Sequence, residues 1–429
     1  MRPPPRRGHH IPYPRRDVVE MLRAGGIVPA AREQAFRDAG RMLSAVMHFE
    51  VHHVVERLKE LHRSCSPDAD VARPPPDGHG ADSADMFIAA FEALLSRANF
   101  ALLSRTEVEE AYRSTAVVNI AVKVRHDDFA VERFHVRGPA VHFRTARSWG
   151  GLRRRRVAFE VYDRVALIIR YKGPEHFAAT GHKLPPFTPG TVAIKLFKSV
   201  PKADLEVLYP SSDVSMRLVD RLVLGIPTVV GGVPLLGKLG GALAVLLGVI
   251  AGVLGYEGIT DEDRLKQAMA SLTAAVALAS FAFQRWVSYQ NRRNAFHREL
   301  ARNLYFRTVA NDTAALFSVA DAAEEEDVKE MLVALGFLLA SPEGVAPEHL
   351  NHAVESWFRD AHGCELVFEC REAVHNLVRL GLARPLPDGH IAPVDLPAAL
   401  AVLDAIWDGY FRFPQPAASA HRIPCPPQA

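Results

Sequence analysis

The stretch "LGGALAVLLGVIAGVLGY" (residues 239–256) contains eighteen residues and no charged side chain. As a helix it would be about 27 Å long, which is close to the roughly 30 Å hydrocarbon core of a bilayer. A second uncharged run of eighteen residues, "QAMASLTAAVALASFAFQ", follows at 267–284. The two runs predict a pair of helices, and the fold depends on whether lipid or protein surrounds them.

The residues that flank the two runs favour lipid. The link between the runs is acidic and includes Glu257, whereas Lys238 and Arg285 belong to basic outer flanks. Trp286 follows the second run, where aromatic residues typically mark a membrane interface. We therefore expect a transmembrane hairpin over 239–284 with both termini cytoplasmic, in a bacterial inner membrane or, in a eukaryote, a mitochondrial membrane. The alternative is a buried helical pair in a soluble domain.

Small residues recur at every fourth position of the first run, at Gly240, Ala244, Gly248 and Gly252. Such a ridge lets helix backbones approach closely, and close packing drives helices together in lipid. We expect the ridge to hold the hairpin together, with homodimerisation through the same ridge as the alternative. Neither run contains an internal Asp, Glu, Lys, Arg or His. Because an ion or proton path normally needs such residues, transport is not indicated.

The hydrophobic pattern on either side of the hairpin predicts an α+β fold. Apolar residues at helical spacing indicate helices over 31–64 and 86–112. Runs rich in Val, Ile and aromatic residues between 115 and 200 indicate a small, mostly antiparallel β-sheet. Near the C-terminus, helices, a short strand and a hairpin at Asp388–Gly389 follow the order of a winged-helix-like α/β unit.

These patterns divide the chain into eight expected segments. They are a basic Pro-rich tail (1–16), an N-terminal helical region (17–113), a β-rich region (114–210), an interfacial or re-entrant lead-in (211–238), the transmembrane hairpin (239–284), a membrane-proximal helix (285–320), an acidic winged-helix-like domain (321–413) and a disordered tail (414–429).

Charge is distributed unevenly between the two parts of the chain. Residues 321–411 contain seventeen acidic and five basic side chains, a net charge of −12, whereas the remainder carries +14. Because DNA phosphates need clustered Lys and Arg, the acidic unit is not expected to bind nucleic acid. We expect a protein partner or self-association instead, with the basic front half as a candidate partner.

Six arginines surround Trp149 in "RTARSWGGLRRRR" (144–156). They are Arg144, Arg147, Arg153, Arg154, Arg155 and Arg156. On the cytoplasmic side of a membrane protein they would bind the lipid bilayer through its anionic head groups, each contributing about 1 kcal/mol. Nucleic acid could be held in the same way, and a solvated hairpin loop is the equal alternative.

Two other groups of residues could carry chemistry. His48, His52 and Glu56 lie at i, i+4 and i+8, a spacing that can hold a metal on one helix face, with ordinary surface histidines as the alternative. The stretch "SVPKADLEVLYP" (199–210) places Asp204 and Glu206 near each other, and paired carboxylates can do acid–base work. Since no nucleophile or His completes that site, we favour a turn set by proline, with Asp204 as a cap.

Several stretches resemble the domain-of-unknown-function 3754 family, which includes a mitochondrial transmembrane protein. They are "IKLFKSVPKADLEVLYP" (194–210), "NLYFRTVANDTAALFSVADAAEEEDVKEMLVALGFLL" (303–339), "LNHAVESWF" (350–358) and "AVHNLVRLGLA" (373–383). The resemblance covers most of the chain between its tails. It implies a membrane protein with paired spans, and it brings no established activity, catalytic residue or cofactor.

We therefore expect a two-span membrane-anchored protein that binds other proteins or lipid surfaces, with no catalysis and no cofactor. The first alternative is a membrane-bound enzyme, which could depend on a metal held by His48, His52 and Glu56. A small oligomeric pore built from the glycine-ridged hairpin is the second alternative.

Overall fold

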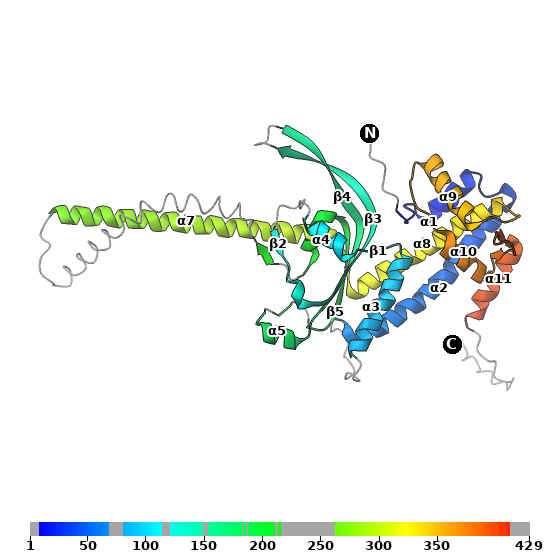
Figure 1. Cartoon of the computed structure of the whole chain (residues 1–429), viewed down its shortest axis with the longest axis horizontal. Helices are drawn as coiled ribbons and strands as arrows, with labels where there is room; N and C mark the ends of the chain where they lie inside the picture. The colour runs from blue at the N-terminus through cyan, green and yellow to red at the C-terminus, as the bar shows by residue number, and fades with distance from the viewer. Residues whose placement is uncertain are drawn as a thin grey trace, which may run out of the picture.

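The computed structural model describes residues 8–67, 80–113, 121–148, 153–182, 184–185, 188–210, 213–215 and 262–411. The expected α+β class with a small antiparallel sheet is confirmed. The main sheet has five strands in the order β1-β3-β4-β5-β7, and every neighbouring pair is antiparallel. The sheet stands between a body of helices and the long helix α7, which extends away from it (Figure 1).

A long hairpin forms the centre of the sheet. Its strands are β3 (Phe129–Ser148) and β4 (Arg153–Tyr171), and β5 (Val192–Pro201) pairs with β4. Short strands β1 (Ala101–Leu102) and β7 (Thr308–Asn311) form the edges. Successive side chains of β4 enter different cores, since Ala166 and Ile168 pack with the helical body while neighbouring Leu167 packs on the opposite face.

Helices and short turns make up most of the rest of the described chain. The helices are α1 (Arg15–Ala24), α2 (Glu33–Cys65), α3 (Gly80–Arg97), α4 (Arg105–Arg113), α5 (Pro174–Thr180), α7 (Glu262–Arg307), α8 (Asp312–Ala340), α9 (Pro347–His362), α10 (Cys370–Arg379) and α11 (Leu396–Gly409). The 3₁₀ turns are η1 (Ala30–Arg32), η2 (His126–Asp128) and η3 (Lys202–Leu208). There are also two small two-stranded sheets. One pairs β2 (Ala121–Lys123) with β6 (Asp213–Ser215), and the other pairs β8 (Ala383–Pro385) with β9 (Ile391–Pro393).

The single helix expected over 86–112 is two helices, α3 and α4. The chain turns between them because Asn99 adopts a left-handed backbone conformation, with φ of 58°. β1 then follows and joins the edge of the sheet. α4 begins with a capping box, in which Glu107 Oε2 accepts a hydrogen bond from the Ser104 backbone N–H at 2.8 Å.

Helix α8 connects the sheet to the C-terminal helices. Its first half packs in the core shared by the sheet, α2 and α3, and its second half packs in the core shared by α1, α2 and α9 to α11. All five residues from Met331 to Leu335 are fully buried, so this part of the helix is enclosed on every side. The expected boundary at 320/321 falls inside α8, and the acidic unit shares one core with the N-terminal helices.

The acidic run of α8 (residues 324–327) pairs with the basic front part of the chain. Arg15 lies 3.6 Å from the carboxylates of both Glu324 and Glu325. His10 lies 2.6 Å from Glu326, and Arg97 lies 2.6 Å from the carboxylate of residue 327. Ion pairs within one chain therefore neutralise part of the charge imbalance seen in the sequence.

A buried ion pair reinforces this contact. Lys329 Nζ lies 2.6 Å from Glu326 Oε1 and donates a hydrogen bond to the backbone oxygen of Ile11 at 2.7 Å. Both charged side chains are almost fully buried. The chain also forms a parallel β-bridge between Gly8 and Leu366, so the N-terminal segment is held against the C-terminal unit.

The transmembrane hairpin expected over 239–284 is wrong. Within the ranges that the structure describes, none of the helices is both long and apolar enough to cross a bilayer. The same finding contradicts the two-span membrane localisation with cytoplasmic termini. The first run, with Gly240, Ala244, Gly248 and Gly252, lies outside the described residues, so their packing is not described.

The composition of the second run (267–284) explains why it is not apolar enough to cross a bilayer. Of its eighteen residues, seven are alanine and five are Ser, Thr or Gln, which leaves six large apolar side chains. In membrane insertion the favourable contributions, about −0.3 to −0.6 kcal/mol each, belong to Leu, Ile, Phe and Val. The run forms part of α7, a single helix of 46 residues that continues into the basic stretch containing Arg292 and Arg293.

Replacing Glu326 by Ala should destabilise the protein strongly, because Lys329 would remain as a buried, unpaired cation. Removing one partner of a buried pair costs about 3–5 kcal/mol. The matched control is Glu325→Ala on the same helix. Its partly exposed carboxylate accepts a hydrogen bond from the Arg15 backbone N–H at 2.6 Å and leaves no buried charge behind when removed, so the change should cost less, about 1–2 kcal/mol. Urea unfolding followed by circular dichroism measures both free energies of unfolding. Equal losses of stability in the two variants would contradict a stabilising role for the buried pair of Glu326 and Lys329.

The stability of the fold should also fall as the pH rises. Burial raises the pKa of Glu330 to about 8 from 4.5, against the hydrogen bond from Asn99, and nearby Glu326, Asp327 and Glu372 raise it further. Between these two pKa values the folded protein holds a proton that the unfolded chain does not, so unfolding releases a proton and becomes easier with rising pH. Thermal unfolding between about pH 5 and 8 should show this slope, and Glu330→Gln should flatten it.

Candidate functional site

The arginine-rich stretch forms the end of the β3–β4 hairpin. The two strands carry all six arginines: Arg144 and Arg147 on β3, and Arg153, Arg154, Arg155 and Arg156 on β4. Arg147 stands opposite Arg154 in the register of the hairpin. The residues that connect the strands, including Trp149, lie outside the described part of the chain. The lipid contact of these arginines stays a prediction.

The three residues expected to hold a metal on α2 have separate surroundings. His48 Nδ1 lies 2.8 Å from Glu324 Oε2 of α8, and Glu56 Oε1 accepts a hydrogen bond from Lys59 Nζ at 2.8 Å. His52 is exposed. Across the described ranges, these three side chains do not form a group with ligand atoms close enough for one ion, whereas a different group does so beside η2.

The stretch around Asp204 forms the expected turn, η3, but its N-cap residue is Pro201 and not Asp204. Asp204 is fully buried, and Arg307 Nη1 at the end of α7 donates a hydrogen bond to its Oδ2 at 3.2 Å. Lys202 lies 3.8 Å from Glu160 of β4, and burial raises the pKa of Glu206. Asp204 and Lys202 therefore contact different elements and do not form one acid–base site. Asp204 fixes the turn to α7.

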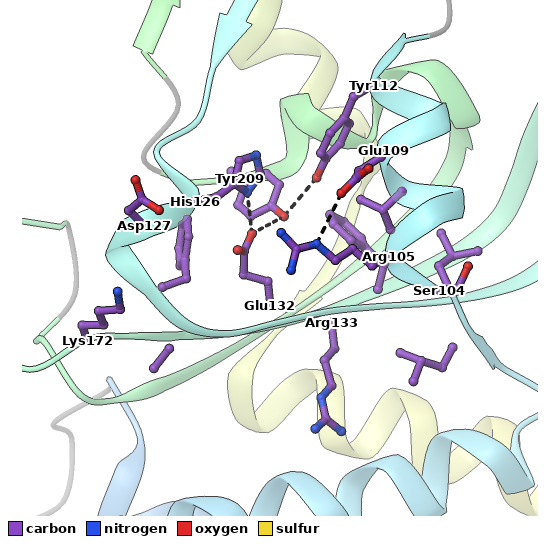
Figure 2. A pocket seen from close by; sticks show the side chains of 16 residues that line it. Ser104, Arg105, Glu109, Tyr112, His126, Asp127, Glu132, Arg133, Lys172 and Tyr209 are labelled. Carbon is purple, nitrogen blue, oxygen red and sulfur yellow. Dashed lines mark hydrogen bonds and ion pairs between the residues drawn. The ribbon is translucent and has the colours of Figure 1, made fainter.

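A cavity of about 680 Å³ is lined by α4, η2 and β3 (Figure 2). Part of its wall is apolar, formed by Leu102, Leu103, Val108, Phe129, Ala130 and Phe134. The polar lining consists of Ser104, Arg105, Glu109, Tyr112, His126, Asp127, Glu132, Arg133, Lys172 and Tyr209. A mostly apolar cavity with a few converging polar groups is the usual form of a small-molecule site.

A chain of hydrogen bonds crosses this cavity, as Figure 2 shows. Tyr209 Oη donates to Glu132 Oε2 at 2.7 Å, and Tyr112 Oη lies 3.1 Å from Tyr209 Oη. His126 Nδ1 approaches the same Glu132 oxygen at 2.8 Å. Because an ionised carboxylate only accepts, the order of donation is Tyr112 to Tyr209 to Glu132, with His126 donating from the other side.

The two tyrosines are fixed hydrogen-bond donors of this network. Burial raises the pKa of both Tyr112 and Tyr209 well above the usual value, so both phenols remain protonated at neutral pH. Arg105 at the rim pairs with Glu109 at 3.3 Å. The cavity offers fixed donors and charged groups of both signs, which suit a small polar molecule.

The same turn, η2, carries a second group on another side. Asp128 Oδ1 accepts hydrogen bonds from His182 Nδ1 at 2.7 Å and from His176 Nε2 at 3.1 Å. Burial opposes the ionisation of Asp128, but hydrogen bonds from His182, Arg125 and His176 outweigh it and lower the pKa of this carboxyl. The ligand atoms of these residues lie within 4.8 Å of one another, which would allow them to hold a metal ion.

A patch of aromatic side chains lies on the surface between α2 and α11. We call Phe49, Trp407, Tyr410 and Phe411 the aromatic patch. The ring of Phe49 lies 4.3 Å from that of Tyr410, 5.3 Å from that of Phe411 and 6.4 Å from that of Trp407. Trp407 is 48% exposed and Phe411 is 68% exposed. Such grouping of large exposed rings is typical of a binding surface.

Sequence reasoning missed the cavity network and the residues around Asp128. Asp128 stands 48 and 54 residues before its two histidine partners, and Tyr112 stands 97 residues before Tyr209. No local spacing signals contacts of this range. The capping box at Ser104 and Glu107 was visible in the sequence and would have marked the start of α4.

These features define an α+β protein with a cavity on its sheet and an exposed aromatic patch. The family model described as "Protein of unknown function (DUF3754)" matches residues 162–314. The chain therefore carries a domain of this family, and the family expected from the sequence is confirmed. The matched segment runs from β4 through η3 and α7 to the start of α8. No solved structure matches the chain.

Replacing Tyr209 by Phe should cost about 1–3 kcal/mol, because Glu132 loses a donor and Tyr112 loses its acceptor. The matched control is Tyr112→Phe, which removes only the outer end of the hydrogen-bond chain and should cost less. Thermal and urea unfolding give both values. A larger loss for Tyr112→Phe would contradict the order of donation.

Proposed function

We propose that this protein is an interaction protein without catalytic activity, and that its aromatic patch binds the arginine-rich hairpin end of a second copy of the chain. The observation that carries the proposal is the exposure of two rings beside Phe49. Trp407 is 48% exposed and Phe411 is 68% exposed. Exposed aromatic side chains that cluster in one place commonly dominate the energy of protein interfaces.

Charge supports an arginine-rich occupant. Asp404 and Asp408 are exposed on α11, which contains no Lys or Arg. Glu50, next to Phe49 in α2, is already paired with Arg379 at 2.6 Å, so Asp404 and Asp408 form the acidic rim of the patch. Guanidinium groups stack on aromatic rings and pair with carboxylates, so a patch of rings with an acidic rim favours Arg over other side chains.

The hairpin end is the strongest concentration of arginine in this chain. Its strands carry four consecutive arginines over 153–156, with Arg147 opposite Arg154. The hairpin end and α11 lie well apart in Figure 1, so the contact requires a second copy. Such a contact is head-to-tail, because each copy would use a different surface.

A mixing experiment tests the proposal. The patch variant carries Trp407→Ala and Phe411→Ala, and the hairpin variant replaces Arg153, Arg154, Arg155 and Arg156 by Ala. The wild-type chain should associate in a concentration-dependent manner, more weakly at high salt, while each variant alone stays monomeric. An equimolar mixture of the two variants should form a one-to-one dimer, because it retains one intact patch and one intact hairpin. Analytical ultracentrifugation measures all four samples.

Tyr305→Ala is the matched control, since Tyr305 is an aromatic residue with 78% exposure on α7 and lies outside the patch. It should associate as the wild type does. Unchanged association of the patch variant would overturn the proposal, and so would a monomeric wild-type chain at high concentration. Binding of the monomer to phosphatidylserine vesicles, lost in the hairpin variant, would instead favour the lipid contact expected from the sequence.

A further inference from the structure

The strongest unassigned group lies where η2 meets α5. Asp128 is 4% exposed, and the nitrogens of two histidines point at the same oxygen, Oδ1. His176 belongs to α5, and His182 follows two residues after its end. Over the described part of the chain, no other three His, Cys, Asp or Glu side chains bring their ligand atoms within 4.8 Å of one another.

We propose that Asp128, His176 and His182 bind a divalent first-row transition-metal ion of the zinc type. Two imidazole nitrogens and one carboxylate oxygen are the ligands that zinc accepts in sites with three protein donors, where water completes the coordination. Hard ions such as Mg²⁺ and Ca²⁺ prefer sets made only of oxygen, so the two histidines disfavour them.

The distances suit this ion. Zinc holds nitrogen and oxygen ligands at about 2.0–2.1 Å, so ligand atoms at the corners of a tetrahedron stand about 3.4 Å apart. The observed separations from Asp128 Oδ1 are 2.7 Å to His182 Nδ1 and 3.1 Å to His176 Nε2. Side-chain movements of less than 1 Å would therefore open the space for the ion, which takes the place of the hydrogens now shared between these atoms.

Neighbouring groups orient the carboxylate ligand. Arg125 Nε lies 3.0 Å from Oδ2 of Asp128, which leaves Oδ1 for the histidines. The Lys172 backbone N–H donates to the backbone oxygen of Asp128 at 3.0 Å and fixes η2 to the end of β4. Hydrogen bonds of this kind hold a metal ligand in a fixed orientation.

The local chain geometry brings the two histidines together. Pro174 starts α5 at its first position, and buried Phe177 anchors the helix to the core. Gly181 then adopts a left-handed conformation, with φ of 66°, and reverses the chain so that His182 returns beside His176. Glycine takes this conformation at no steric cost, because it has no Cβ.

The site is accessible and adjoins the cavity. The side chains of His176 and His182 are 20% and 35% exposed, so an ion can enter without unfolding the chain. His126 and Asp127, the other two residues of η2, line the cavity of Figure 2. A bound ion would fix η2 against α5 and so stabilise one wall of that cavity.

Titration of the purified full chain with Zn²⁺, after removal of metal by a chelator, tests the site. We expect one zinc per chain, and Co²⁺ in its place should give the visible absorption of a four-coordinate ion. His182→Ala should weaken zinc binding by at least about tenfold to a hundredfold, because loss of a direct ligand should cost no less than loss of an outer-shell partner. Asp128→Asn should weaken it similarly, and circular dichroism checks that both variants fold.

His52→Ala is the matched control, since it removes an exposed histidine from the helix where the sequence predicted a metal. It should bind zinc as the wild type does. Absence of stoichiometric zinc in the wild type, or unchanged binding by His182→Ala in a folded protein, would overturn the proposal. Loss of binding in His52→Ala would place the ion on α2 instead and would equally overturn it. The titration does not depend on self-association, because it can be performed on the patch variant as well.

Discussion

The contact between the acidic run of α8 and the front of the chain is the interaction on which the remaining structure depends. α8 runs through both main cores, so its charged residues can be buried only if each finds a partner. Glu326 is 1% exposed, and His10 and Lys329 both lie 2.6 Å from its Oε1. Because breaking a buried pair is costly, this contact fixes the N-terminal segment against the C-terminal helices.

The sheet then separates two environments. Alternate residues of β4 pack either against the helical body or against the opposite core, which contains α5, η3 and the aromatic wall of the cavity. The cavity and the Asp128 group both depend on η2, which is tied to the end of β4 by the backbone hydrogen bond from Lys172 and by the pairing of Phe129 with Tyr171. The helical body and the cavity are therefore built on opposite faces of the same strands.

Several parts of the fold could be read from local patterns. Helix α2 (Glu33–Cys65) matches the expected 31–64 except for its first two residues, which lie in η1. The hairpin expected at Asp388–Gly389 is present as β8 and β9. The charge imbalance pointed to a contact between the two parts of the chain, which Arg97 and the α8 acidic run make. The lipid environment expected from the two uncharged runs and their charged flanks is wrong. Much of the second run is alanine and small polar residues, which contribute little to membrane insertion.

Sequence by itself determined the α+β class, the main helices and strands, the family and the opposite charges of the two parts of the chain. Each of these follows from hydrophobic periodicity, composition or sequence motifs within a short stretch of chain. Only the tertiary structure decided which side chains meet. Asp128 meets two histidines about fifty residues away, Tyr112 meets Tyr209, and His48 turns to α8 instead of joining His52 and Glu56. Such groups form because the sheet and a left-handed glycine bring distant segments together, and no local spacing contains that information.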